Sequence, residues 1–273
     1  MTYFSEIVHL SDIARVHGDR CPEKNAFVFE DRVVTYNEFD INSEKVANGL
    51  VSENVAEQER VAYMDKNSDR FYELVMGCAK SNSVIVGINW RLAPPEVAYI
   101  LNDSSAKILF VGEDFFGLVE KILQDVPSIE KVICMSGTNK NWPTYEDWRD
   151  KQSNSICDRK PQLKDVAIQM YTSGTTGNPK GVVYHHRGSY LMATGSAAAW
   201  NMPNRLNFLY TVPMFHCNGW CYPWTLVMLH ARVICIRTIR AKEIFELIEE
   251  HKVTHFGGAP IILNMLTSAP KEE

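Results

Sequence analysis

Short apolar runs rich in β-branched residues alternate with longer amphipathic segments along the first half of the chain. The runs predict strands, and the segments between them follow a helical period of apolar positions. Strand–helix alternation at this spacing indicates βαβ units and mostly parallel sheets covered by helices on both faces. The predicted strands are Val61–Met64, Val84–Ile88, Lys107–Val111 and Lys131–Cys134, and the predicted helices are Phe71–Lys80, Pro95–Asn102 and Phe115–Val126.

A further helix is predicted from Tyr36 to about Val51 by a signal at its amino end. Thr35 stands where a helix cap belongs, and Glu38 follows three residues later. This spacing allows the threonine hydroxyl and the glutamate carboxylate to bond reciprocally to the backbone N–H groups of the first turn, as in a capping box.

The pattern changes over Asp150–Lys164, which is polar, contains a proline and predicts a linker. We therefore expect an α/β fold with an amino-terminal subdomain over 1–160 and a second subdomain over 161–273, incomplete at its carboxyl end. After the linker, the predicted strands are Val166–Tyr171, Gly181–His185, Phe208–Val212 and Arg232–Ile236, and the predicted helices are Arg187–Trp200 and Ala241–His251.

Size and charge narrow the function classes. The chain has 273 residues, 45% of them hydrophobic, which suffices for a large core. A net charge of −5 without a Lys/Arg run argues against binding to nucleic acid or to an anionic membrane. The longest apolar stretch, Trp220–Leu229, contains Pro223 and is too short for a membrane span.

The seven cysteines are scattered, and several lie within apolar runs, where cysteine behaves as a small buried hydrophobe. This usage predicts free thiols and a reducing compartment. The amino end, MTYFSEIVHL, lacks the basic head and long apolar run of a signal peptide. We therefore expect a cytoplasmic location.

The segment MYTSGTTGNPKGVVYHH, residues 170–186, concentrates hydroxyl side chains, glycines and one lysine between two apolar runs. Its spacing, G-x-x-G-x-x-K, fits neither a Walker A loop nor a dinucleotide fingerprint, and both flanking elements are predicted strands. The glycines would let backbone N–H groups approach an anion, the hydroxyl groups would donate hydrogen bonds, and Lys180 would add positive charge. From these residues alone, a polyphosphate site and an ordinary solvated turn both remain open.

Four segments resemble the adenylate-forming superfamily, which includes acyl-CoA synthetases, luciferases and peptide-synthetase adenylation domains. YTSGTTGNPKGV resembles its phosphate-binding loop, and VPMFHCNGW (Val212–Trp220) resembles its aromatic–histidine segment. Gly87–Glu113 and THFGGAPIILNML (Thr254–Leu266) also resemble acyl-CoA synthetases, and all four keep the family order. The combination of FHCNGW with YHHRGSYLMA is most similar to short- or medium-chain fatty acyl-CoA or aryl-CoA ligases.

The resemblance implies a two-step ligase reaction. A carboxylate attacks the α-phosphate of ATP and releases pyrophosphate, and the thiol of CoA then displaces AMP from the acyl-AMP. ATP, CoA, a carboxylic acid and Mg²⁺ are the implied substrates and cofactor. The residues that the resemblance implies for holding the β- and γ-phosphates are Thr172, Ser173, Gly174, Thr175, Thr176, Gly177 and Lys180.

The resemblance also implies a site for the acid. It places His216 near the substrate carboxylate, Trp220 in a wall of the acyl pocket, and Gly258, Ala259 and Pro260 at its border. The residues alone equally fit a hydrogen-bonded core histidine and a strand-to-helix turn that begins at Pro260. The C-x-x-x-C spacing after His216 is not that of a usual zinc site, so no metal is expected there.

The family's adenine-contacting turn, its magnesium-binding acid, its ribose-binding aspartate and its catalytic lysine have no counterpart up to Glu273. We therefore expect the chain to correspond to the amino-terminal portion of an acyl-CoA synthetase, inactive alone and able to self-associate through exposed apolar surface. A phosphoryl-transfer enzyme and a non-catalytic module that binds nucleotide or acyl ligand remain alternatives.

Overall fold

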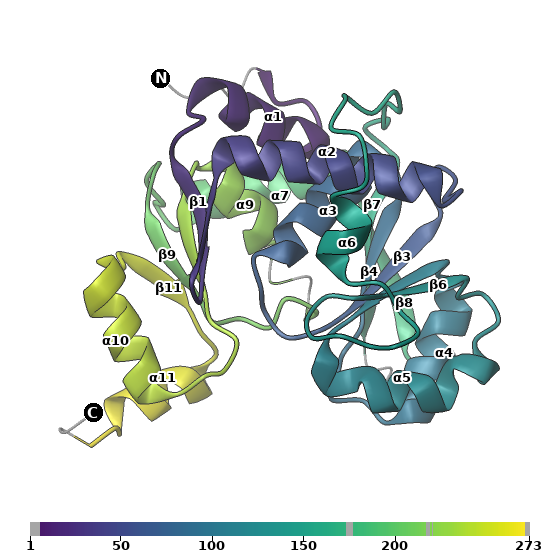
Figure 1. Cartoon of the computed structure of the whole chain (residues 1–273). Coiled ribbons are helices and arrows are strands. Elements are labelled where there is room, and N and C mark those ends of the chain that lie inside the picture. The colour runs from purple at the N-terminus through teal and green to yellow at the C-terminus, as the bar shows by residue number, and fades with distance from the viewer. Residues whose placement is uncertain (1–5, 173–176, 217–218, 220, 271–273) are drawn as a thin grey trace.

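The computed structural model describes residues 6–172, 177–216, 219 and 221–270. It contains two sheets with helices between them and on both outer sides (Figure 1). The helices and strands are α1 (Leu10–Arg20), β1 (Asn25–Phe29), β2 (Arg32–Thr35), α2 (Tyr36–Ser52), β3 (Arg60–Met64), α3 (Arg70–Lys80), β4 (Val84–Gly87), α4 (Pro94–Ser104), β5 (Ile108–Val111), η2 (Glu113–Phe115), α5 (Phe116–Ile122), η3 (Leu123–Asp125), β6 (Lys131–Cys134), α6 (Tyr145–Arg149), β7 (Val166–Thr172), β8 (Lys180–His185), α7 (His186–Ala199), β9 (Asn207–Tyr210), α9 (Tyr222–Met228), β10 (Arg232–Cys235), α10 (Ala241–His251), β11 (His255–Gly257) and α11 (Pro260–Thr267).

The strand pairing confirms the predicted α/β class with mostly parallel sheets. One sheet has the order β11-β9-β10-β1-β2, and the other has the order β6-β5-β3-β4-β7-β8. Antiparallel pairing occurs at the β1–β2 and β7–β8 hairpins, and the other strand pairs are parallel. Each sheet combines strands from before and after residue 160, so the sheets cross the predicted boundary between 1–160 and 161–273, which stays a prediction.

Alternation along the strands sends apolar side chains into separate layers. On β3, Val61 and Tyr63 join the core between the two sheets, whereas Ala62 and Met64 face α4 and α5. On β9, Phe208 faces the same central core and Leu209 faces the outer layer of α10 and α11. This two-sided burial explains why the strands are continuous apolar runs in the sequence.

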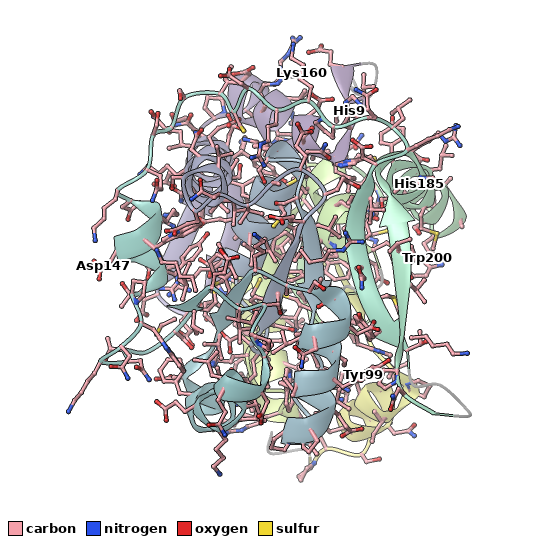
Figure 2. All side chains as sticks on the ribbon, turned by 90° about the vertical axis from the view of Figure 1, so that its right-hand side faces the viewer. His9, Tyr99, Asp147, Lys160, His185 and Trp200 are labelled. Carbon is pink, nitrogen blue, oxygen red and sulfur yellow. The ribbon has the colours of Figure 1, made fainter. Side chains whose placement is uncertain are left out.

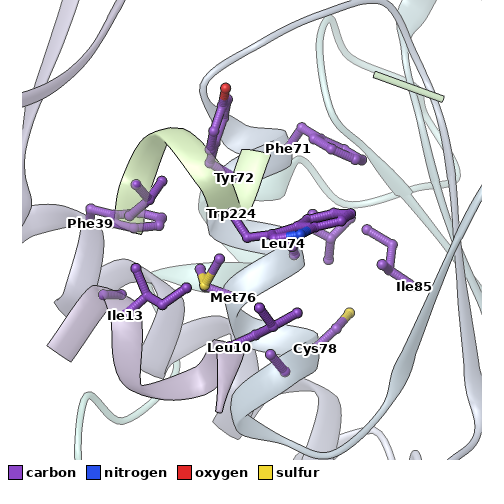
Figure 3. Packing of buried hydrophobic residues seen from close by; sticks show 14 of the residues in the cluster. Leu10, Ile13, Phe39, Phe71, Tyr72, Leu74, Met76, Cys78, Ile85 and Trp224 are labelled. Atoms are coloured by element: carbon purple, nitrogen blue, oxygen red, sulfur yellow. The ribbon is translucent and has the colours of Figure 1, made fainter. Parts of the chain in front are cut away.

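Helices α1, α2, α3 and α9 supply the central core. Figure 3 shows Trp224 of α9 beside Leu74 and Met76 of α3, with Leu10 of α1 and Phe39 of α2 close by. Trp224 is fully buried, and its indole N–H donates to the carbonyl of Ser189 at 3.1 Å, so its polar atom is satisfied. The core therefore fixes both sheets to one helical layer.

The predicted capping box of α2 is confirmed. The Thr35 hydroxyl accepts from the Glu38 N–H at 3.2 Å, and the Glu38 carboxylate accepts from the Thr35 N–H at 2.7 Å. The polar segment Asp150–Lys164 contains no helix or strand, as its composition predicts. Within the described residues, no helix is both long enough and apolar enough to cross a membrane.

Three imidazoles lie in the interior or at its margin, where burial disfavours their charged form. The rings of His17 and His230 stack at 4.8 Å between centroids, and burial lowers the pKa of both, that of His230 to about 4. His186 is fully buried, its ring nitrogens have no hydrogen-bond partner among the described residues, and burial lowers its pKa to about 4. All three are therefore neutral in the folded protein near neutral pH.

These imidazoles predict an acid-sensitive fold. An imidazole whose pKa is lower in the folded state takes up a proton on unfolding when the pH is below its ordinary pKa. The stability that its neutral form allows is therefore fully present above about pH 6.5 and is lost as the pH falls toward 4. We expect urea unfolding to show that the free energy of unfolding decreases by on the order of 1 kcal/mol for each of His186 and His230 between pH 7 and pH 5.

His230→Asn is the matched test, because residue 230 has φ +55° and asparagine tolerates this conformation. In this variant, the free energy of unfolding should depend less on pH, because the contribution of His230 is removed. An unchanged slope of unfolding free energy against pH would contradict this assignment.

Candidate functional site

The carboxyl ends of strands from both sheets meet at one crevice. Asp65 follows β3, Arg237 follows β10, and the guanidinium donates to both carboxylate oxygens at 3.0 and 3.4 Å. The Asp65 carboxylate is almost fully buried, and burial raises its pKa although Arg237 opposes the shift. In sheets of parallel strands, ligand sites form in the crevice at the carboxyl ends.

The glycine-rich segment 170–186 begins at this same edge. Strand β7 lies parallel to β4 with Met170 opposite Gly87, and it returns antiparallel as β8 with Thr172 opposite Lys180. The predicted hairpin connection between two strands is confirmed. Gly177 has φ +145°, a conformation that favours glycine, and an added Cβ would meet no atom within 4 Å. Ser173, Gly174, Thr175 and Thr176 lie outside the described residues.

A cavity of about 490 Å³ lies at the carboxyl ends of β4, β9 and β11. It brings together four residues that the sequence pointed to, His216, Gly258, Ala259 and Pro260. Trp220 lies outside the described residues. The other lining residues are Arg91, Trp200, Thr211, Val212, Pro213, Tyr222, Ile239, Gly257, Ile261 and Ile262, so the walls are largely apolar.

His216 is exposed at the end of the segment that leaves β9, and its position depends on neighbours that are buried. Phe215 is buried, and its ring meets that of Trp90 edge-on at 5.8 Å. Arg91 stacks over both rings, at 4.7 Å from the Trp90 centroid and 5.7 Å from that of Phe215. A cation–π contact orients a guanidinium without using its N–H donors, so Arg91 brings available donors to the cavity.

Two tyrosines shape the opposite side of this segment. The Tyr210 hydroxyl donates to the Gly219 carbonyl at 3.0 Å, and an added Cβ on Gly219 would lie 1.7 Å from that hydroxyl oxygen. Tyr222 lines the cavity, and burial raises the pKa of its phenol to about 12. The Tyr222 ring also packs against Gly257, where an added Cβ would come within 2.9 Å of its hydroxyl oxygen.

Sequence reasoning missed several cavity residues. Arg91 lies in the segment Gly87–Glu113, which resembles acyl-CoA synthetases, but that resemblance gave it no role. Trp200 follows α7 and its ring meets that of Tyr222 at 5.5 Å, a contact between residues on different elements. An arginine next to a tryptophan was the one local signal for Arg91, whereas Trp200 gave none.

Metal binding is not supported by the described side chains. No group of three or more His, Cys, Asp or Glu in the described part of the chain could hold a metal ion. Cys21, Cys78, Cys134, Cys157 and Cys235 are free thiols, and Cys217 lies outside the described residues. The implied Mg²⁺ therefore finds no fitting donor set among the described residues.

Comparison with known proteins gives one family. A family model described as "AMP-binding enzyme" matches residues 14–273. Acetate/butyrate–CoA ligase AAE7, peroxisomal, of Arabidopsis thaliana is 32% identical over 271 residues, which cover 92% of this chain and 48% of that protein. Fatty acid–[acyl-carrier-protein] ligase ScoC of Streptomyces coeruleorubidus is 32% identical over 263 residues, 93% of this chain and 48% of ScoC.

Solved structures are similar to this chain over nearly its whole length. The N-terminal domain of FACL13 from Mycobacterium tuberculosis superposes with a TM-score of 0.90 at 28% identity, over 96% of this chain and 66% of that domain. A fatty acyl CoA synthetase from the same organism gives a TM-score of 0.88 at 27% identity, over 97% of this chain and 52% of the synthetase. The chain thus spans about half the length of the curated relatives it matches.

Gly219 generates a prediction about the segment that carries His216. In Gly219→Ala, the new Cβ would collide with the Tyr210 hydroxyl in a backbone with φ +67°. Steric strain and the lost hydrogen bond should reduce the free energy of unfolding by roughly 2–4 kcal/mol. Urea unfolding measures this loss.

Gly117→Ala is the matched control. Gly117 lies within α5, and an added Cβ would meet no atom within 4 Å, so stability should stay equal or rise by up to about 1 kcal/mol. Equal stability of both variants would contradict the close approach of Tyr210 to Gly219.

Proposed function

Because this chain belongs to the family of AMP-binding enzymes, we propose that it forms the phosphate-binding and acid-binding portion of a ligase that converts a carboxylic acid to acyl-AMP and then to acyl-CoA. One observation carries the proposal. The hairpin that leaves β7 and the cavity that contains His216 both arise at the carboxyl ends of strands, and β4 and β7 are neighbours there. A triphosphate and an acid bound at these two places would meet.

The hairpin would hold the β- and γ-phosphates of ATP during the first step. The carboxylate oxygen attacks the α-phosphorus, the bond to the bridging oxygen breaks, and pyrophosphate leaves. Fixed N–H and hydroxyl donors together with the Lys180 ammonium stabilise the charge that builds on the departing phosphates. The proposed phosphate-binding residues are Thr172, Ser173, Gly174, Thr175, Thr176, Gly177 and Lys180.

The cavity would bind the acid. Its apolar walls suit an alkyl or aryl group, and His216 stands where a carboxylate could accept a hydrogen bond. We assign Trp220, Gly258, Ala259 and Pro260 to the same subsite. In the second step, the CoA thiol attacks the acyl carbon and AMP leaves. Acetate, butyrate and fatty acid in the names of relatives support a small or aliphatic acid as substrate.

We propose the cytoplasm as the compartment, because Cys21, Cys78, Cys134, Cys157 and Cys235 are free thiols, as in a reducing environment. One relative is named as peroxisomal, so the peroxisome is the alternative that localisation of a tagged full-length protein would test. Mg²⁺ is proposed as the companion of ATP, with its ligands outside the residues described here.

A phosphoryl-transfer enzyme would use the same hairpin differently. It would release ADP, whereas adenylation releases pyrophosphate. The family match favours adenylation. We propose that this chain alone binds its ligands but does not complete acyl-CoA synthesis, and acyl-CoA production by the pure chain from ATP, CoA and a fatty acid would overturn that.

The phosphate site predicts a strong effect of Lys180→Ala. Losing a charged hydrogen bond to phosphate should cost about 1.5–3 kcal/mol, which is roughly a tenfold to hundredfold weaker binding of ATP. Calorimetric titration of ATP into the full chain measures the dissociation constant. Lys164→Ala removes an exposed lysine before β7 and should leave the constant unchanged. Equal affinity of wild type and Lys180→Ala would remove Lys180 from the site.

Exposed apolar side chains on β8 and α7 support self-association. β8 is an edge strand, and Val183, Leu191 and Met192 are each at least half exposed. Figure 2 shows His185 at the end of β8 and Trp200 after α7 along one margin of the molecule. An open edge strand beside apolar side chains is a template for pairing with a second copy.

Self-association predicts a concentration-dependent mass. Light scattering after size exclusion should show a larger mass for the wild type at high concentration, and Val183→Lys should lower it because it charges the edge strand. Exposed Val33 on the other sheet gives the control, Val33→Lys. A monomeric wild type at all concentrations would contradict this surface assignment.

A further inference from the structure

The turn after β3 reaches across to the segment after β9 through one side chain, Asn67. Its amide nitrogen donates to the Val212 carbonyl at 2.9 Å and lies 3.4 Å from the Tyr210 carbonyl oxygen. Its amide oxygen accepts from the Met214 N–H at 2.9 Å. Asn67 is 7% exposed, so these bonds are shielded from water. The two partners lie more than 140 residues away along the chain.

This pattern matches the pairing of a parallel strand. In a parallel ladder, one residue donates its N–H to the carbonyl of residue i−1 on the neighbouring strand, and its own C=O accepts from the N–H of residue i+1. The Asn67 carboxamide makes both bonds to Val212 and Met214, on either side of Pro213. Strand β9 ends at Tyr210, where its pairing with β10 and β11 also ends. The side chain thus replaces a neighbouring strand for the residues that follow.

The turn that carries Asn67 is itself fixed on both sides. The buried Tyr63 hydroxyl donates to the Lys66 carbonyl at 2.6 Å. Asp65 is bound by Arg237, and on the other side Asp69 accepts two hydrogen bonds from Arg32 at 2.6 and 3.0 Å. The backbone of the turn is thus held on both sides of Asn67.

The backbone that Asn67 holds forms part of the cavity. Val212 and Pro213 line it, the buried Met214 and Phe215 anchor the chain beneath, and the exposed His216 follows directly. Without the carboxamide, the Val212 carbonyl and the Met214 N–H would lie beside the interior with no partner among the described residues. Unpaired backbone groups of this kind favour movement of the segment toward water.

We propose that Asn67 is a positioning residue, whose carboxamide acts as a surrogate strand that holds Val212–Met214 and thereby sets the place of His216 in the acid-binding cavity. Its effect on the acid rests on the proposed function. Its effect on the backbone does not, because the hydrogen bonds exist in the chain by themselves.

Amide hydrogen exchange of the full chain, resolved by NMR, tests the backbone arm. In Asn67→Ala, exchange at Met214 should rise at least tenfold, whereas amides of β5 and β6 should change less than twofold. In Asn67→Asp, the oxygen acceptor remains and the donor is lost, so Met214 should keep most of its protection. If Asn67→Ala does not fold, Asn67→Asp tests the positioning role instead, since it should weaken the binding of octanoate.

Asn207→Ala is the matched control. Asn207 stands at the opposite end of β9, and its amide also donates to two backbone carbonyls, those of His251 and Lys252 at 3.2 and 3.1 Å. This variant should leave Met214 exchange within twofold of the wild type. Unchanged Met214 exchange in Asn67→Ala, or an equal rise at all amides through global unfolding, would overturn the positioning role.

Binding of octanoate, followed by tryptophan fluorescence, tests the consequence for the cavity. Both Asn67 variants should raise the dissociation constant for octanoate at least fivefold, and Asn207→Ala should leave it unchanged. If wild type fails to bind octanoate while Met214 behaves as predicted, the positioning role stands and the acid site under the proposed function falls. Equal octanoate affinity of wild type and both Asn67 variants would overturn the link from Asn67 to the cavity.

Discussion

The arrangement of this molecule depends on polar contacts that join the carboxyl ends of two sheets with no strand in common. The buried ion pair between Asp65 and Arg237 and the hydrogen bonds from Asn67 to the backbone after β9 both start from the turn that follows β3. A buried ion pair adds little net stability, but breaking it leaves an uncompensated charge. The ion pair therefore favours the relative position of the sheets in which both charges are paired. The burial of the apolar helices between the sheets stabilises that position.

This fixed position brings residues from both sheets to the candidate site. One sheet contributes the hairpin between β7 and β8 and the Arg91 side chain beyond β4, and the other contributes the segment before His216 and the turn at Gly258. The adenylation proposed for this chain would require an acid oxygen and an α-phosphorus to approach in line, and it would use groups from both sheets. A small rotation of one sheet against the other would separate them, which makes the clamp between the sheets part of the proposed chemistry.

Much of the fold could be predicted from the sequence where the signal was local. The Thr35–Glu38 capping box and strand β6 (Lys131–Cys134) follow from neighbouring residues and lie where predicted. Helix α9 was not predicted, because every residue of Tyr222–Met228 is buried and the segment therefore has no amphipathic period. The pairing of β1 with β10 joins segments about two hundred residues apart, and no local pattern encodes it. For the candidate site, motif resemblance pointed to His216 and the turn at Gly258, which line one cavity, but not to the residues that hold them.

Asn67 shows why the supporting residues stay hidden. In the sequence it belongs to DKNSD, which reads as an ordinary polar turn, and only its distant partners give it another role. The same segment is held at its other end by Tyr210, whose hydroxyl binds the Gly219 carbonyl. Between these two fixed points the backbone carries His216 with its side chain exposed toward the cavity. A segment that is restrained at both ends and exposes a side chain between them suits a binding site. Because the segment is already ordered before the ligand binds, less conformational entropy is lost on binding.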